Sequence, residues 1–269
     1  MTEINHADIE PYLRLSVFLG VLLVMMLAEW LFPRRDTQSR LKRWPSNIGL
    51  VVLNTLIVRV ILPGVTVALA IYLTDKQFGL MYWLNIPSAV ALVVCVLLLD
   101  MMIYWQHRWF HHVPMLWHIH RMHHADKVID VTTGARFHPI EIVASTLLKL
   151  IAITVLGASA WAVIIFEILL NGTAMFNHSN VNLPQWLDRI LRPVLVTPDM
   201  HRVHHSVHAS EHHQNFGFNL SVWDRWFKSY TAQPKDGHLE MQIGLPYFRE
   251  DEQALLHNML KQPFDDTGK

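Results

Sequence analysis

The sequence predicts an all-α fold: a polytopic bundle of about four to five membrane helices, with a histidine-rich cap for two metal ions on the cytoplasmic side. Two observations support this prediction. Hydrophobic residues make up 52% of the 269 residues and charged residues only 16%, which is typical of a membrane protein with a substantial water-facing part. The chain also has 18 histidines, many of them in short helical patterns beside or between the apolar segments.

The same composition argues against several classes of function. The formal net charge is zero, whereas proteins that bind nucleic acid concentrate an excess of Lys and Arg on one face, so we expect no nucleic-acid partner. Cys95 is the single cysteine of the chain. The protein therefore cannot form an internal disulfide, a thiolate zinc finger or a cysteine-bound iron–sulfur cluster.

Two apolar runs, 15–32 and 48–73, predict the first membrane helices. We expect the first to be a retained helix, because the residues before it are acidic rather than basic and include no small-residue cleavage site. The segment 34–43 between the runs holds five basic residues, which marks its side of the membrane as cytoplasmic. We therefore expect an integral protein of a bacterial inner membrane with its catalytic face in the cytoplasm.

The later apolar runs lead to and from the histidines. A helix from 88 to about 113 would be roughly 39 Å long against a hydrocarbon core of roughly 30 Å, so its last two turns, with His107 and His111, must emerge into the cytoplasm. The runs 142–156 and 160–176 predict either a hairpin of two thin spans or a re-entrant pair. Both arrangements return the chain to the side it left, which places the histidines before and after this pair on one side.

The predicted organisation has three parts. Residues 1–86 form the N-terminal membrane helices, and 87–233 form a catalytic region that combines membrane helices with cytosolic histidine clusters. Residues 234–269 form a cytosolic tail. We expect one short amphipathic helix at 184–194, lying on the membrane surface, and another near 254–260 in the tail.

Eight histidines form three helical groups. Histidines four residues apart share one face of a helix, and the spacing i, i+3, i+4 directs three rings toward one point. The first group is such a pair, and the other two repeat the string H-R-x-H-H. Imidazole suits zinc, copper, iron and nickel, and eight ligands exceed the needs of one zinc ion. The pattern predicts a centre with two metal ions at His107, His111, His120, His123, His124, His201, His204 and His205.

Two alternatives come from other functional classes. A zinc-dependent membrane hydrolase would need only three or four ligands and a carboxylate base, so the surplus of histidines counts against it. A non-catalytic metal-binding or transport protein would place ligands along a path through the spans, whereas these gather at one face. The H-E-x-x-H string of zinc peptidases and the Glu-x-x-His pairs of carboxylate-bridged di-iron bundles are both absent from the sequence.

Further strings accompany the histidine groups H-R-W-F-H, H-R-M-H-H and H-R-V-H-H, namely F-H-P-I-E, N-H-S-N and N-F-G-F-N-L-S-V-W-D-R-W-F. In this order and spacing they resemble the fatty acid hydroxylase and sterol desaturase superfamily of membrane di-iron oxygenases, over roughly residues 100–230. The resemblance implies that the eight histidines bind two iron ions and that His138 and His178 also lie at the metals. The chain departs from it at Lys228-Ser229, where a Gly-Thr pair is common.

The resemblance also implies the reaction. Reductive activation of O₂ at the iron pair removes hydrogen from a C–H bond of a lipid, such as a fatty acyl chain or a sterol-like ring, and gives a hydroxyl group or a double bond. The sequence does not identify the substrate or decide between hydroxylation and desaturation. It also indicates no catalytic residue beyond the metal ligands. The chain has no dinucleotide-binding glycine motif and no haem domain, so we expect a ferredoxin or a b-type cytochrome with a reductase to supply two electrons.

Three carboxylates are candidates for a supporting role. A metal-bound imidazole usually donates its other N–H to a carboxylate or carbonyl oxygen, and we expect Asp100, Glu141 and Asp224 to accept such bonds. For Asp224 the cap of a helix or turn is an equal alternative. Among the other histidines, His208 stays open as a further ligand, whereas we expect His212 and His213 in solvent.

Overall fold

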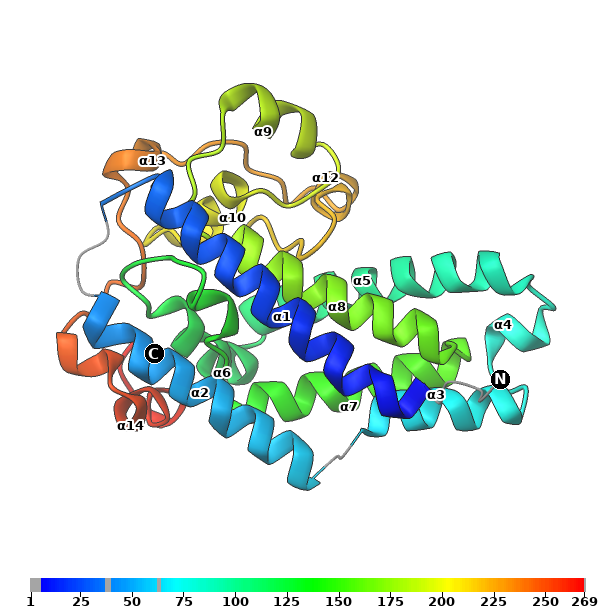
Figure 1. The fold of residues 1–269 in the computed structure, drawn as a ribbon. Helices are drawn as coiled ribbons and strands as arrows, with labels where there is room; N and C mark the ends of the chain where they lie inside the picture. The colour runs from blue at the N-terminus through cyan, green and yellow to red at the C-terminus, as the bar shows by residue number, and fades with distance from the viewer. Residues whose placement is uncertain (1–5, 37–39, 62–63, 269) are drawn as a thin grey trace.

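Long helices run along one axis of the molecule, and short helices and loops gather at one end of it (Figure 1). The structure, a computed structural model, describes residues 6–36, 40–61 and 64–268. The all-α prediction is confirmed, because the named elements of this part are all helices and its only ladder contacts are three isolated bridges. The long helices are α1 (His6–Leu31), α2 (Arg40–Ile61), α3 (Val65–Asp75), α5 (Ser88–His112), α7 (Pro139–Leu156) and α8 (Ala160–Asn177).

Five stretches of the described residues are long and apolar enough to cross a membrane. Their side chains explain why so many apolar residues stay on the outside: Leu23 and Val24 of α1, for example, are each 64% exposed, as expected for a surface that faces lipid rather than water. The five stretches are Tyr12–Leu31, Lys42–Trp83, Ser88–His112, Pro139–Leu156 and Ala160–Asn177.

Helices α7 and α8 form a hairpin that runs the length of the bundle. Gly157, which ends α7 with a left-handed φ of 68°, lies against Gly79 in the loop after α3. A Cβ built on Gly79 would be 2.3 Å from the Gly157 nitrogen, so both positions require glycine. The turn between α7 and α8 therefore reaches the end of the molecule where α4 (Leu80–Trp83) lies, which favours two spans over a re-entrant pair (Figure 1).

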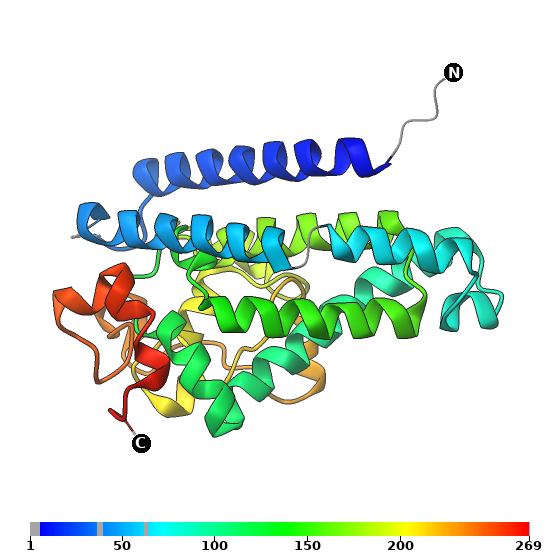
Figure 2. The same cartoon turned by 90° about the horizontal axis from the view of Figure 1, so that it is seen from below.

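The opposite end of the molecule carries the cap. Its short elements lie beside the ends of α1, α5 and α8 (Figure 2). The predicted amphipathic helix is α9, whereas the predicted tail helix is two short turns, interrupted at Leu255 by an extended backbone. The cap comprises α6 (Pro114–His124), η1 (Thr133–Ala135), α9 (Gln185–Leu191), α10 (Pro198–His204), α11 (Ala209–His212), α12 (Val222–Trp226), α13 (Gly237–Glu240), η2 (Asp251–Ala254), α14 (Leu256–Met259) and η3 (Gln262–Phe264).

The cytoplasmic segment predicted from its basic residues begins at this same end. The Arg34 N–H donates to the Asn180 carbonyl (2.7 Å), and the Asn182 N–H donates to the Phe32 carbonyl (2.8 Å). Glu29 of α1 accepts from the Asn180 N–H at 2.7 Å as well. The start of segment 34–43 and the histidines thus share one end, as the alternation of spans requires. The middle of this segment, residues 37–39, lies outside the described residues.

A buried ion network joins α2 to the loop after α6. Arg43, which is 3% exposed, donates to both carboxylate oxygens of Asp126 and, at 2.7 Å, to Asp130. Burial alone would raise the pKa of Asp126, but the guanidinium groups of Arg43 and Arg136 hold this pKa below its usual range. The network therefore places a buried arginine between two buried aspartates, and it keeps Asp126 in its charged form.

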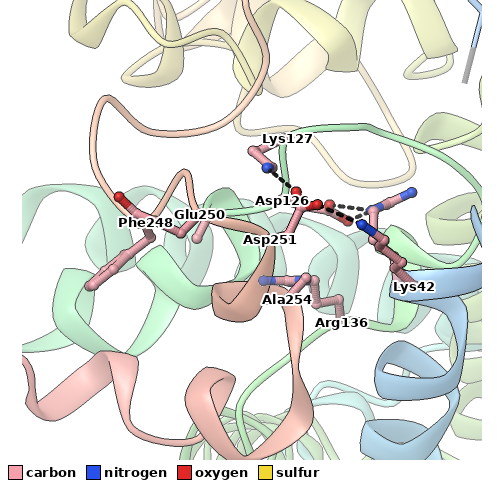
Figure 3. Close-up of a pocket in the computed structure, with 10 residues that line it drawn as sticks. Lys42, Asp126, Lys127, Arg136, Phe248, Glu250, Asp251 and Ala254 are labelled. Atoms are coloured by element: carbon pink, nitrogen blue, oxygen red, sulfur yellow. Dashed lines mark hydrogen bonds and ion pairs between the residues drawn. The ribbon is translucent and has the colours of Figure 1, made fainter. Parts of the chain in front are cut away.

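An exposed ion cluster lies above this network. Figure 3 shows Lys127 and Lys42 directed toward Asp251, with Asp126 and Arg136 beside them in the same small pocket. The Lys42 Nζ is 2.9 Å and the Lys127 Nζ 2.8 Å from the Asp251 carboxylate. These contacts connect the tail to α2 and to the loop after α6, but they are open to water, where ion pairs contribute little to stability.

We expect the two ion clusters to differ in their effect on stability. Arg43→Met leaves Asp126 and Asp130 buried without their cation and should lower the free energy of unfolding by about 3–5 kcal/mol. Asp251→Asn, the matched exposed control, should leave the thermal unfolding midpoint nearly unchanged. The measurement is thermal unfolding of both variants in mild detergent, and equal midpoints for them would contradict this account.

Candidate metal centre

Nine buried histidines meet where α5, α6, α8 and α10 converge. They fall into two groups, and within each group every ring offers a nitrogen that lies within 4.8 Å of those of the others. All nine side chains are at most 5% exposed. The first group is His107, His111, His120, His124 and His204, and the second is His123, His178, His201 and His205.

Two short helices contribute to both groups. Helix α6 presents His120 and His124 to the first group and His123 to the second. Helix α10 presents His204 to the first group, and its His201 belongs to the second together with His205, the residue after the helix. The rings of His124 and His205, one from each group, are stacked with centroids 4.5 Å apart. The two groups are therefore direct neighbours.

Local sequence explains why α6 and α10 begin where they do. Each has proline at its first turn, Pro114 in α6 and Pro198 in α10, where the missing N–H costs no hydrogen bond. The residue before each proline is extended, and Thr197 also caps α10 by accepting from the Met200 N–H at 3.4 Å. The first histidine that belongs to either group follows six residues after the start of α6 and three residues after the start of α10, which fixes the direction of the rings.

In four rings the outer nitrogen, which is Nδ1 and points away from the other histidines, is hydrogen-bonded to a main-chain carbonyl. A carbonyl oxygen can only accept, so the proton of each of these imidazoles lies on Nδ1 and the lone pair on Nε2. The Nδ1–H groups donate from His107 to Phe216 (2.9 Å), from His123 to Arg136 (3.1 Å), from His178 to Ala174 (2.7 Å) and from His204 to Gln214 (2.7 Å).

In six of the nine rings the inner nitrogen has no hydrogen-bond partner, whereas in the second group the His178 Nε2 lies 3.1 Å from the His123 Nε2 and 2.9 Å from the His201 Nε2. The Nε2 atoms of His107, His120, His124 and His204 are buried and accept no hydrogen bond from any described residue. For His111 and His205 the same holds for both ring nitrogens. Buried lone pairs that face one another are unfavourable unless a cation binds between them. This donor set therefore fits metal ions, with imidazole as the sole kind of first ligand.

Burial also sets the protonation of the rings. Removal from water, reinforced by the neighbouring imidazoles, lowers the pKa of five cap histidines well below its usual value, and burial lowers the pKa of His178 to about 4. These rings are neutral at pH 7, as metal ligation requires. The pKa values lowered well below the usual one belong to His123, His124, His201, His204 and His205.

The three candidate carboxylates take two different positions. Glu141, in the first turn of α7, accepts the Nδ1–H of His120 at 2.8 Å, as expected. Asp100 instead accepts from the Trp223 indole (2.7 Å), and Asp224 accepts from the Phe216 N–H (2.8 Å). Among the described residues, the hydrogen bonds of these two aspartates go to the loop 216–229 and not to a histidine.

The two aspartates nevertheless act on the first group through that loop. Asp224 holds the Phe216 and Gly217 N–H groups at 2.8 and 2.7 Å, and the Phe216 carbonyl is the acceptor of His107. Burial raises the pKa of Asp224 to about 6, although its hydrogen bonds oppose this rise. The contacts of Asp224 thus match the alternative role given for it above, that of a residue that caps a turn. Near it, Lys228 adopts a φ of 58°, which explains why glycine suits that position.

His138 lies outside both groups. It is the N-cap of α7, where its Nδ1 accepts from the Ile140 N–H at 3.2 Å, and its Nε2 lies 3.3 Å from the Leu260 carbonyl. Pro139 at the first position of α7 places His138 at this cap. Both of its nitrogens are thus engaged away from the nine histidines, and we leave His138 out of the ligand set proposed below.

The remaining histidines differ from expectation in one respect. His208 is partly exposed and lies 2.6 Å from the Asp236 carboxylate, away from both groups. His213 is half-buried. His212, expected in solvent, is 6% exposed and stacks on Trp117 with centroids 5.4 Å apart. Sequence reasoning missed this contact because Trp117 belongs to another helix, 95 positions earlier in the chain.

Comparison with known proteins agrees with this arrangement. The family model described as fatty acid hydroxylase matches residues 92–229, slightly more than half of the chain. An ornithine lipid hydroxylase of Rhizobium tropici is 28% identical over 58% of this chain and 46% of its own length. An alkylglycerol monooxygenase of Danio rerio is 24% identical over 80% of this chain and 46% of its own length. A lathosterol oxidase of Rattus norvegicus is 27% identical over 53% of this chain and 45% of its own length.

The chain thus spans less than half the length of these curated relatives. No solved structure matches it.

The contact between Glu141 and His120 predicts a graded effect on metal retention. Glu141→Gln keeps an acceptor oxygen but loses its charge, and we expect it to lower metal affinity about tenfold. Glu141→Ala removes the acceptor and should lower it further, toward about 100-fold. Competition with a chelator measures both, with Glu250→Gln as an exposed control. Unchanged affinity in Glu141→Ala would show that this carboxylate does not support the site.

Proposed function

The chain belongs to the fatty acid hydroxylase family, and from this premise we propose that it is a membrane di-iron oxygenase that oxidises a C–H bond of a lipid. Its five apolar stretches make it an integral membrane protein. The names of its relatives describe a lipid hydroxylase, a monooxygenase and a sterol oxidase, which supports an oxidoreductase that acts on lipids. We leave the substrate and the choice between hydroxylation and desaturation to experiment.

One observation carries the proposal: nine buried imidazoles in two adjacent groups of five and four. Zinc takes four ligands in structural sites and three from the protein in catalytic sites, so a group of five suits it poorly. Imidazole also suits iron, which accepts more ligands. A zinc hydrolase would further need a carboxylate free to act as a base, whereas Glu141 is engaged with His120. Two irons therefore fit the donor set better than zinc does.

The protein's own residues would supply position and protection. The nine histidines would hold the irons, and the carbonyls of Phe216, Arg136, Ala174 and Gln214 keep the proton of their rings on Nδ1. Glu141 does the same for His120 and adds a negative charge. When bound, the iron pair would supply O₂ activation: with two electrons and two protons, one oxygen atom enters the C–H bond and the other leaves as water.

The position of the centre suits a lipid substrate. His107 and His111 lie in the last two turns of α5, at the end of a membrane-spanning stretch. A lipid that enters sideways from the bilayer would meet the centre close to headgroup level. We infer that this end faces the cytoplasm of a bacterial cell, because the basic segment starts beside it. A ferredoxin or b-type cytochrome with a reductase would bring the electrons there.

The decisive experiment combines metal analysis with lipid analysis. We expect roughly two irons per chain in protein purified in mild detergent. His120→Ala and His204→Ala should lose iron, whereas the exposed control His257→Ala should keep it. Cells that express the unchanged chain should accumulate lipids heavier by one oxygen or lighter by two hydrogens, as measured by mass spectrometry.

Two outcomes would overturn the proposal. Zinc without iron, together with unchanged lipids, would favour the hydrolase. Full metal content in both histidine variants would mean that the two groups are not the metal site.

A further inference from the structure

A second layer of three imidazoles lies between the first group and the surface. His112, the last residue of α5, is exposed, and His213 is half-buried. Their ring centroids are 5.4 Å apart, and those of His212 and His213 are 4.6 Å apart. Neighbouring rings within the first group show similar distances, for example 5.0 Å between His107 and His111. The mechanism proposed above uses none of these three histidines.

We propose that His112, His212 and His213 form a loading site, which captures a divalent metal ion from solution and passes it to the first group. This inference rests on the proposed function, since it requires that the two groups bind metal. The chemistry of the ligands defines the ion. Imidazole nitrogens suit first-row ions such as Fe²⁺ and disfavour Mg²⁺ and Ca²⁺, which prefer oxygen ligands.

The rings of the loading site are prepared for metal in the same way as those of the two groups. The His112 Nδ1–H donates to the Arg108 carbonyl at 2.8 Å, and the His212 Nδ1–H donates to the Ser206 carbonyl at 3.2 Å. Their lone pairs therefore lie on Nε2. His208, four residues before His212, shows the contrast, because its Nε2 faces the Asp236 carboxylate at 2.6 Å.

The layer leads to His111 of the first group, which has both ring nitrogens available for an ion. The His213 ring lies 5.6 Å and the His212 ring 6.2 Å from the ring of His111, between centroids. His111 has no hydrogen-bond partner on either nitrogen within the described chain. It is only 3% exposed, so an ion cannot meet it directly from solution. The exposed His112 and the half-buried His213 supply the intermediate step.

Trp117 packs between the loading site and the first group and positions their rings relative to one another. Its ring stacks on His212 with an interplanar angle of 13°, and its centroid lies 5.0 Å from that of His111 and 5.5 Å from that of His124. The same indole thus contacts a ring of the loading site and two rings of the first group. An ion released by His212 or His213 would move only one ring further to reach the first group.

The test measures how fast the ion arrives rather than how much is bound. Metal-free protein, prepared with a chelator, receives Fe²⁺ without oxygen, and bound iron is measured at successive times. We expect the double variant His112→Ala/His213→Ala to take up iron about tenfold more slowly than the unchanged protein, with the same final iron content. His257→Ala, an exposed histidine of the tail, should load at the unchanged rate.

A second measurement does not require metal-free protein. A route that speeds the arrival of an ion also speeds its departure, so a chelator should remove iron from the loaded double variant more slowly by a similar factor. Uptake and removal at unchanged rates would overturn the loading site and leave the proposed function intact. A lower final iron content would also overturn it, by making these histidines permanent ligands. If the unchanged protein itself bound no iron, the proposed function would fail first.

Discussion

Nine imidazoles can be packed together away from water only if each is neutral and has its proton on the outward side. This constraint governs the capped end of the molecule. A single protonated ring among them would repel its neighbours at low dielectric, and a ring with its proton turned inward would offer a bound metal ion no lone pair at that nitrogen. The surrounding chain fixes the position of the proton where it offers an acceptor to the outer nitrogen, and for five of the nine rings that acceptor is a carbonyl or the Glu141 carboxylate.

Much of the cap can be understood as support for those acceptors. The loop that carries the Phe216 carbonyl packs Phe216 and Trp223 against Tyr104, and Asp100 and Asp224 hold it further through its N–H groups and the Trp223 indole. The buried pair of Arg43 with Asp126 similarly fixes the loop between α6 and η1, which leads to the Arg136 carbonyl. Buried charge is thus placed beside the histidines but not among them.

The long helices and the grouping of eight candidate histidines followed from sequence because both depend on short-range periodicity. Ser88–His112 and Ala160–Asn177 end within one residue of the expected bounds, since apolar length and an N-terminal proline or serine mark them directly. His178 was indicated only by family resemblance. The acceptors of the rings could not be predicted, because every residue has a carbonyl and its direction depends on loop conformation. The burial of His212 depends on Trp117 in the same long-range way.

Two positions that the resemblance singles out have a local backbone that explains their contacts. A histidine before proline was expected at the metals, but the proline that follows His138 makes it a helix cap and commits both of its nitrogens. The departure at Lys228 marked a real feature, since this lysine occupies a left-handed backbone conformation. A motif therefore indicates that a position matters but does not by itself assign the role, which the local backbone decides.

Helix α6 has a further consequence, because one rigid rod of eleven residues carries ligands of both groups. Any rotation that improves the fit of His120 and His124 to one ion also turns His123 relative to the other. Binding at the two groups would thus be coupled through α6. Part of the binding free energy of the first ion would be used to order this helix, and the second ion would bind to a helix that is already ordered. Such a centre favours the empty and doubly filled states and keeps the half-filled state scarce.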